Sequence, residues 1–526
     1  MFRTATVLVP VLACVALAVP TAGSTVGPAP IADSQDPTAA PAFVGRPAAP
    51  RPLPANAQFT PRVGDMHGDG GNTNSSPFPG PLGSRPATTS AAAKLSPLVF
   101  DPAGRLTAGH VNTSTGTPLY GVAVADPRTL AVTAEWDAPA GQTLNLGYLY
   151  QSATGEVLVT SREGHVYVVD RDDSAATPVL HLVRDVDLVA GGVLTQGQSL
   201  LNAAFDADGD IWFTTGGIVG LGQDAGTATT LGYIQPDGLV HSLTIANEAV
   251  ENGIAVSDTT AYVVTGPVAA DRSNATGAMY AFGHGGATTV TTLWSQRYAG
   301  GSARKPGGFA RGSGATPTLL GNRYVAVTDN ADDQVALLVY RQPPAPAGRS
   351  QLVCRVPLFS PGASANDIGL VGTQTGDEDS VLVLNNDNAP AFQAAPADVN
   401  GAFNAMTAMS PGVEKVSVAA GGSGCPVNWN TPLRVKSVPV LSTATGLVYG
   451  YTQDSDLAAG GIYAWYFVAV DYRTGSVVWR VRAGGGGTFN DDYKAATLGP
   501  DGTLYQGVLG GVAMLAGPCA SAVRPG

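Results

Sequence analysis

Short apolar runs, separated by tight turns, occupy the chain from about residue 95 to residue 515. β-Branched and aromatic residues dominate the runs, as in 156–161 and 164–170, and Gly, Asp and Asn stand between them. Such segments predict β-strands. Asp208-Gly209 and two similar Asp-Gly pairs lie between neighbouring runs, where glycine supplies the positive φ of a tight hairpin. No amphipathic helix longer than about two turns is indicated, so the pattern predicts an all-β fold.

Three segments share a longer pattern, in which a strand with an aromatic residue near its start is followed by a turn and a second strand that ends in tryptophan. The tryptophans are Trp136, Trp294 and Trp479, so their spacings are 158 and 185 residues. These spacings divide into three and four units of about 50 residues, a period typical of propeller blades. We therefore expect a single β-propeller of seven or eight four-stranded blades, with each tryptophan packed between neighbouring blades.

The ends of the chain differ from this body. Residues 1–23 place Arg3 before an apolar run and small residues after it, which predicts a signal peptide and a secreted, extracellular or periplasmic protein. Cys14 leaves a lipoprotein as the alternative. Residues 24–62 are rich in Ala and Pro and lack periodicity, so we expect a disordered leader. We expect a lead-in segment at 63–94, the propeller at 95–517 and a tail at 518–526.

Composition and charge narrow the range of partners. The 67 glycines, 39 prolines and only 13% charged residues suit short strands joined by turns. The formal net charge is −12, and no run of Lys and Arg offsets it, so a phosphate backbone would be repelled. We therefore expect no nucleic-acid partner, no membrane span in the mature chain and a monomer.

Three cysteines remain after the predicted signal peptide. Cys354 lies in strand-like sequence, Cys425 in a turn-like Gly-Ser-Gly-Cys-Pro segment, and Cys519 in the tail. We predict a Cys354–Cys425 disulfide and a free Cys519, because disulfides persist in exported proteins. The alternative is three unreactive thiols.

One blade-like segment carries a family resemblance. Residues 471–479, Asp-Tyr-Arg-Thr-Gly-Ser-Val-Val-Trp, resemble the blade signature of the quinoprotein alcohol dehydrogenase-like superfamily, the propellers with pyrroloquinoline-quinone repeats. Residues 66–76 resemble the lead-in of such propellers. The resemblance implies a propeller fold and a quinone-linked activity. Many of those enzymes have vicinal cysteines, and this sequence has no Cys-Cys pair.

Two other segments resemble a different group of propellers. Residues 202–215 and 252–258 are similar to blades of gluconolactonase-type and streptogramin-lyase-type proteins, which implies a divalent ion, calcium or a similar cation, near the channel mouth. The positions that match are Asn202 and Asn252, and Asn366 is a third asparagine of the same kind. We found no convincing Glu for such a site, and the alternative is that these asparagines cap turns.

Other candidate chemistry is weaker in the sequence. Asp206-Ala-Asp-Gly-Asp210 has its glycine too early for a calcium loop, so we interpret it as a hairpin turn, and we interpret 329–333 and 490–492 as solvated acidic turns. His241 and His284 are candidates for the base of a lyase, although neither lies in a matching motif. The sequence identifies no catalytic residue and no cofactor-binding residue beyond the possible cation site.

These observations leave two functional hypotheses. The first is a secreted propeller that binds a small molecule, a glycan or a protein at its axial face. The second is an extracytoplasmic enzyme, either a metal-dependent lactonase, hydrolase or lyase, or a quinone-linked oxidoreductase. The sequence alone leaves both open.

Overall fold

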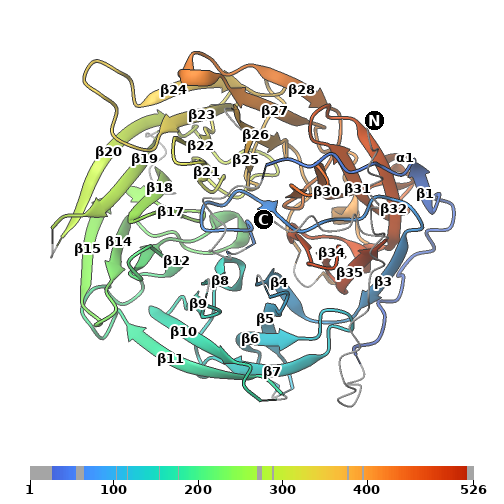
Figure 1. Ribbon diagram of the computed structural model, residues 1–526, viewed down its shortest axis with the longest axis horizontal. Coiled ribbons are helices and arrows are strands. Elements are labelled where there is room, and N and C mark those ends of the chain that lie inside the picture. The colour runs from blue at the N-terminus through green and yellow to red at the C-terminus, as the bar shows by residue number, and fades with distance from the viewer. Residues whose placement is uncertain are drawn as a thin grey trace, which may run out of the picture.

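Eight β-sheets surround one axis in the computed structural model, so the molecule is an eight-bladed β-propeller (Figure 1). The structure describes residues 27–54, 64, 66–101, 103–114, 116–152, 154–175, 177–268, 275–286, 289–375, 378–393 and 396–517. The predicted all-β, single propeller is confirmed, with the higher of the two expected blade numbers. The predicted signal peptide and the C-terminal tail with Cys519 lie outside the described residues.

The blades follow one another along the chain, and in most of them the innermost strand comes first. Blade 1 consists of β4 (Leu95–Phe100), β5 (Leu106–Asn112), β6 (Leu119–Ala125) and β7 (Val132–Asp137). Blade 2 consists of β8 (Tyr150–Gln151), β9 (Val157–Thr160), β10 (His165–Asp172) and β11 (Val179–Asp187). Blades 3 and 4 are β12 (Leu200–Phe205), β13 (Ile211–Thr215), β14 (Ala228–Ile234), β15 (Val240–Ala246), and β17 (Ala255–Ser257), β18 (Thr260–Pro267), β19 (Thr276–His284), β20 (Val290–Ala299), with β16 (Glu248–Ala249) beside β18.

The second half repeats this arrangement. Blades 5 and 6 are β21 (Thr318–Leu320), β22 (Tyr324–Thr328), β23 (Ala336–Arg341), β24 (Leu352–Pro357), and β25 (Val371–Thr375), β26 (Glu378–Leu384), β27 (Val413–Val418), β28 (Val427–Thr431). Blade 7 is β29 (Val440–Ser442), β30 (Leu447–Gln453), β31 (Ala464–Asp471), β32 (Val477–Gly485), and blade 8 is β33 (Ala496–Leu498), β34 (Leu504–Val508), β35 (Gly511–Ala516) and β3 (Ala87–Ala91). The one α-helix among the described residues is α1 (Ser455–Ala459), and no helix there is long and apolar enough to cross a membrane.

The ring is closed by a strand from the N-terminal side of the chain. β3 pairs antiparallel with β35 and forms the outer edge of blade 8 (Figure 1). The propeller therefore begins before residue 95, and the predicted boundary between lead-in and propeller is wrong. The sequence did not indicate this strand because its Ala, Thr and Ser residues are small and mostly exposed, as expected at an edge with one covered face.

The leader is also part of the folded body. β1 (Phe43–Gly45) pairs with β32, and the amides of Ser34 and Arg51 donate hydrogen bonds to the carbonyl oxygens of Gly485 and Thr445. The prediction of a disordered leader is therefore wrong for residues 27–54. This segment has no core of its own, but the exposed edge of β32 satisfies its backbone groups, and blade 7 buries its few apolar side chains.

The three tryptophans lie between blades, as expected. Each is on the fourth strand of its blade, and Trp136 and Trp294 contact Tyr167 and Tyr340 of the following blade, with ring centroids 5.4 and 5.9 Å apart. Trp479 is fully buried among residues of blades 7 and 8. Trp294 and Trp479 each adjoin a β-bulge in the pairing with the third strand, whereas Trp136 lies two residues farther from its bulge. It is accordingly only half-buried.

The predicted disulfide is confirmed. Cys354 on β24 is bonded to Cys425, which precedes β28, with 6.3 Å between the two Cα atoms. The bond joins the outer strand of blade 5 to the outer part of blade 6. It therefore fixes the contact between these two blades at the rim of the ring.

Candidate functional site

The axial channel is plugged by the lead-in segment, which crosses the centre of the ring (Figure 1). Carbonyl oxygens of Gly70, Gly71, Thr73 and Asn74 accept hydrogen bonds from amides at the inner strands β17, β21, β25 and β29, at 2.8–3.0 Å. Continuing the same path, β2 (Ser75–Ser76) pairs parallel with β29. The segment that the sequence singled out as a lead-in thus lines the inner edges of four successive blades. It prevents the channel from being an open tunnel.

A cavity of about 220 Å³ lies on this plug, at the end of the axis where the innermost strands begin. All eight blades contribute to its wall, and the lining includes Pro97, Tyr148, Ile218, Asn252, Phe309, Asp367, Lys436 and Lys494. Met66 and His67 of the plug also line it. The wall is largely apolar with a few ionisable groups, which is the usual composition of a small-molecule site. We call this space the axial cavity.

Two carboxyl groups dominate the chemistry of the axial cavity. Glu251 is 6% exposed and accepts a 2.8 Å hydrogen bond at Oε2 from the amide of Arg311. Its Oε1 has no partner with full hydrogen-bond geometry among the described residues, although the amide of Val219 is near enough to lower the pKa of the carboxyl. Burial raises the pKa of Glu251 to about 8, and the nearby charge of Asp367 adds to the shift. Burial likewise raises the pKa of Asp367 to about 6, although the amides of Phe309 and Ala310 donate to this carboxyl.

Across the cavity, a lysine and an aspartate form a buried pair. Lys436 Nζ donates to Asn490 Oδ1 at 2.7 Å and lies 3.1 Å from Asp491 Oδ1. The side chains of Lys436 and Asp491 are both buried, with 1% and 0% exposed. The prediction of a solvated turn at 490–492 is therefore wrong, because this turn precedes the inner strand of blade 8 and faces the axis. Burial lowers the pKa of Lys494, whose side chain also lines the cavity.

His67 forms part of the cavity floor. Its Nε2 lies 3.2 Å from the hydroxyl oxygen of Thr316, and the residue is 3% exposed. Burial lowers the pKa of His67 to about 4, so the ring is neutral at physiological pH. The plug thus contributes a neutral imidazole to the site.

The three predicted asparagines all lie near the starts of inner strands, but only two of them meet. The Asn202 amide donates to the carbonyl oxygen of Asn252 at 3.0 Å, and Asn252 lines the axial cavity. The Asn252 side-chain oxygen accepts hydrogen bonds from the hydroxyls of Tyr148 and Thr316.

Asn366 is directed elsewhere. Its amide donates to the carbonyl oxygen of Leu384 on β26, the second strand of blade 6. Its side-chain oxygen accepts from the hydroxyl of Thr328 on β22, the second strand of blade 5. These bonds tie neighbouring blades together, so the cation site that the asparagines predict stays a prediction. Sequence reasoning missed Glu251, although its position directly before Asn252 was a usable signal.

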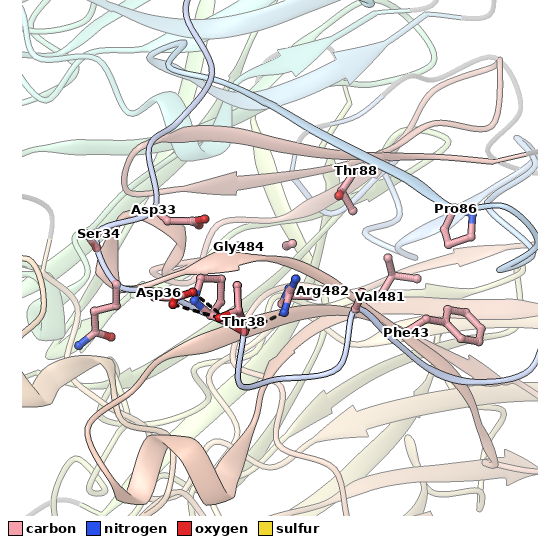
Figure 2. Close-up of a pocket in the computed structure, with 14 residues that line it drawn as sticks. Asp33, Ser34, Asp36, Thr38, Phe43, Pro86, Thr88, Val481, Arg482 and Gly484 are labelled. Atoms are coloured by element: carbon pink, nitrogen blue, oxygen red, sulfur yellow. Dashed lines mark hydrogen bonds between the residues drawn. The ribbon is translucent and has the colours of Figure 1, made fainter.

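A second hollow lies outside the ring. The groove between the leader and the outer strands β32 and β3 has a volume of about 720 Å³ (Figure 2). Asp36 accepts hydrogen bonds from the backbone and hydroxyl of Thr38 there, and Arg482 donates to the carbonyl oxygen of Pro37. These polar groups bond to one another and brace the leader. The groove is somewhat more open than the axial cavity.

Comparisons with known proteins add little about function. No family model matches the chain, so the quinoprotein resemblance stays a prediction. An uncharacterized protein of Archaeoglobus fulgidus is 27% identical over 245 residues, which cover 42% of this chain and 45% of that protein. The chain thus matches less than half the length of this relative.

Solved structures of similar shape are propellers. The Dos1 propeller matches with a TM-score of 0.44 and 10% identity over 69% of this chain and 76% of that one. Streptogramin B lyase matches with a TM-score of 0.36 and 10% identity over 81% of this chain and 93% of that one. At this level of identity a likeness concerns the fold alone, and we take no activity from it.

Proposed function

We propose that this propeller is a secreted binding protein whose axial cavity takes a small, mostly apolar molecule that carries an amino group. The observation that carries the proposal is Glu251, a residue of the cavity wall whose buried Oε1 has no partner with full hydrogen-bond geometry among the described residues. Native proteins rarely leave such an atom unsatisfied, and each exception calls for an explanation. A bound ligand that donates a hydrogen bond supplies one.

The charges around the cavity favour an amine over an acid. Lys436 is already paired with Asp491, and burial lowers the pKa of Lys494, the other lysine of the wall. Glu251 and Asp367 have no ion pair with Lys, Arg or His in the part of the chain that the structure describes. Arg304, and for Asp367 also Lys305, favour their ionised forms, but less than burial opposes them. A cationic group placed beside these two carboxyls would favour their ionised forms and offset the cost of their burial. The apolar wall around Phe309 and Ile368 would hold the rest of the ligand.

A binding screen tests this proposal. Primary-amine fragments and their neutral isosteres are titrated by calorimetry against the purified mature chain. We expect the amines to bind more tightly, and Glu251→Gln to weaken them at least about tenfold by removing a charge-assisted hydrogen bond. Glu414→Gln is the matched control, because Glu414 is 5% exposed but lies outside the cavity. Equal affinity of the wild type and Glu251→Gln would refute the proposal.

An acid–base enzyme is the second candidate, favoured by the same two carboxyls. Glu251 and Asp367 line one cavity, and burial places both pKa values close to neutrality, which is common for catalytic acids and bases. In a hydrolase or lyase, one carboxyl would donate a proton while the other accepts one. This candidate predicts that Glu251→Gln lowers turnover about 100-fold or more. A screen that finds binding but no conversion of any ligand supports the binding protein instead.

A further inference from the structure

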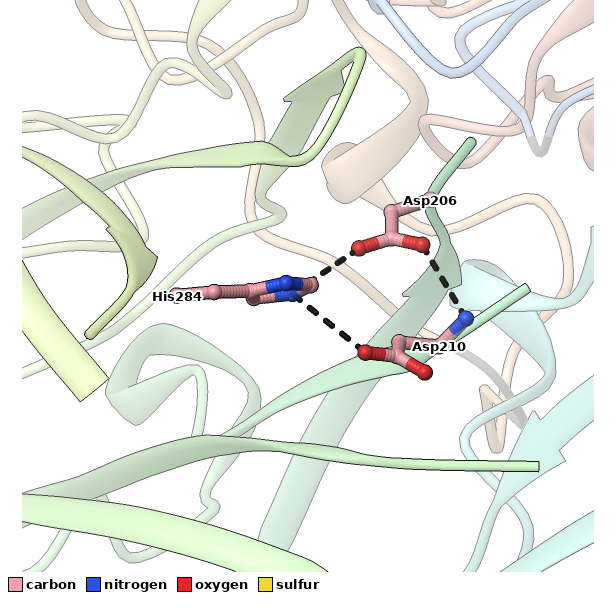
Figure 3. A group of neighbouring side chains, drawn as sticks. All are labelled: Asp206, Asp210 and His284. Atoms are coloured by element: carbon pink, nitrogen blue, oxygen red, sulfur yellow. Dashed lines mark hydrogen bonds and ion pairs between the residues drawn. The ribbon is translucent and has the colours of Figure 1, made fainter. Parts of the chain in front are cut away.

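A histidine of blade 4 lies between two aspartates of blade 3 (Figure 3). All three lie near the ends of their strands or in the hairpin after the inner strand β12, whereas the axial cavity lies where the inner strands begin. Asp206 and Asp210 flank the hairpin between β12 and β13, and His284 is the last residue of β19. His284 Nε2 lies 3.2 Å from Asp206 Oδ2 and 3.4 Å from Asp210 Oδ2. One ligand atom from each residue lies within 4.8 Å of the other two. The three side chains therefore converge on one point.

The geometry of this group differs from that of a hydrogen-bonded ion pair. Neither contact of His284 Nε2 has hydrogen-bond geometry, since this buried nitrogen has no hydrogen-bond partner among the described residues. Both carboxylates approach the same ring nitrogen. Ligands bound at about 2.1 Å to a tetrahedral ion stand about 3.4 Å apart, close to the two distances observed. The spacing thus suits three donors around a shared ion.

Neighbouring groups hold these donors in place. Asp206 Oδ1 accepts hydrogen bonds from the amides of Asp208 and Asp210, and its Oδ2 accepts one from the indole of Trp212 at 3.1 Å. The His284 ring stacks on Trp212 at 5.6 Å and lies 4.3 Å from the Tyr233 ring. Partners of this kind orient the ligands of protein metal sites.

Charge balance points the same way. The side chains of Asp206 and Asp210 are 0% and 5% exposed, and neither forms an ion pair with Lys or Arg in the described parts of the chain. His284 itself, and then His241 and Arg184, lie close enough to favour the charge of Asp210, but Arg184 donates its hydrogen bond to the carbonyl oxygen of Gln235. Two buried carboxylates without a full counter-charge are costly. A divalent cation would compensate both.

We propose that Asp206, Asp210 and His284 bind one divalent transition-metal ion, Zn²⁺ or a similar ion, which joins blade 3 to blade 4. One imidazole and two carboxylates form a donor set that Zn²⁺ accepts, and three protein ligands leave a position for water. Ca²⁺ instead prefers six to eight oxygen ligands, so it fits this set poorly. The half-buried His284, with 22% of its side chain exposed, gives the ion a path from solvent.

The test is a zinc titration of the mature chain, purified without a polyhistidine tag and stripped with a chelator. We expect one Zn²⁺ per chain by calorimetry and elemental analysis, weaker Ca²⁺ binding, and a higher melting temperature with Zn²⁺. Asp210→Asn, which keeps the size of the side chain, and His284→Ala should each weaken Zn²⁺ binding at least about tenfold. Melting curves without metal show whether each variant folds. If His284→Ala does not fold, the Zn²⁺ affinity of Asp210→Asn alone decides the test.

His165→Ala is the matched control. His165 also contacts two aspartates, but through different ring nitrogens, with Nδ1 2.8 Å from Asp185 and Nε2 3.6 Å from Asp187. These contacts cannot converge on one ion, so His165→Ala should bind Zn²⁺ like the wild type. Absence of binding at millimolar Zn²⁺, or unchanged binding by Asp210→Asn, would overturn the proposal and leave an ion pair only.

Discussion

Glu251 and Asp367 reach one axial cavity from blades 4 and 6, and the charge of Asp367 adds to the burial that raises the pKa of Glu251. Chain segments more than 100 residues apart thus place two carboxyls in the wall of one mostly apolar cavity. Such an arrangement destabilises the ionised protein unless something else compensates it. The cost suggests that the arrangement serves a ligand.

This pair predicts how stability depends on pH. Because the pKa of Glu251 is raised from 4.5 to about 8, the folded state binds this proton more tightly than the unfolded state does. Its contribution to stability is full below pH 4.5 and decreases as pH rises to about 8, by at most about 5 kcal/mol. Glu251→Gln removes this slope. Urea unfolding of both proteins across this range measures it, and parallel curves would show that Glu251 is not protonated in the native state.

His67 predicts the opposite dependence. Burial lowers its pKa from 6.5 to about 4, so the unfolded state binds the proton more tightly. The contribution of His67 to the free energy of unfolding is full above pH 6.5. It decreases by about 3 kcal/mol as pH falls to about 4. We expect His67→Gln to lose less free energy of unfolding over this interval than the wild type. If the variant loses as much free energy of unfolding between pH 6.5 and 4 as the wild type, groups other than His67 cause the loss.

The plug should contribute strongly to stability. The Asn72 amide donates buried hydrogen bonds to the carbonyl oxygens of Ile254 and Pro317, at 2.8 and 3.0 Å. Asn72→Ala leaves both carbonyls unsatisfied, so we expect a loss of about 2–4 kcal/mol in urea unfolding. Asn388→Ala is the control, because Asn388 has the same φ of 54° but is exposed. Equal losses in the two variants would assign the effect to the left-handed backbone rather than to the plug.

The disulfide should stabilise the contact between blades 5 and 6. Cys354 and Cys425 are 71 residues apart, and closing a loop of that length stabilises by about 4 kcal/mol in the chain-entropy model. The double variant Cys354→Ala/Cys425→Ala should lose about this much free energy of unfolding. Peptide mapping without reductant checks the pairing in the exported protein. A linkage of Cys519 to either partner would contradict it.

The sequence predicted the fold well because blade architecture is local. Alternating strands and Asp-Gly turns are features that neighbouring residues determine. The 158 residues from Trp136 to Trp294 span three blades, as their spacing predicted, but the 185 residues from Trp294 to Trp479 also span three blades and not the four predicted. The ring closure by β3 and the course of the leader along β32 were missed, because small and Pro-rich segments take their order from distant strand edges. Their own sequences carry little signal for either role.

The sites were harder to predict for the same reason. Asn252 was predicted as a site residue, but its neighbour Glu251 was overlooked. Asp367 lines the same cavity as Glu251 because the fold arranges blades 4 and 6 around one axis. Asp206-Ala-Asp-Gly-Asp210 is a hairpin turn, as the order of its residues indicated, yet His284 joins it from another blade. Local motifs cannot show which residues of eight blades converge.

The most direct test of the proposed function is a crystal structure of the mature chain soaked with the tightest-binding amine fragment. The fragment should lie in the axial cavity, with its nitrogen within about 3.2 Å of Glu251 Oε1 and its apolar part against Phe309. A fragment bound only in the groove between the leader and β32, or an axial cavity that stays empty at saturating fragment, would contradict the account.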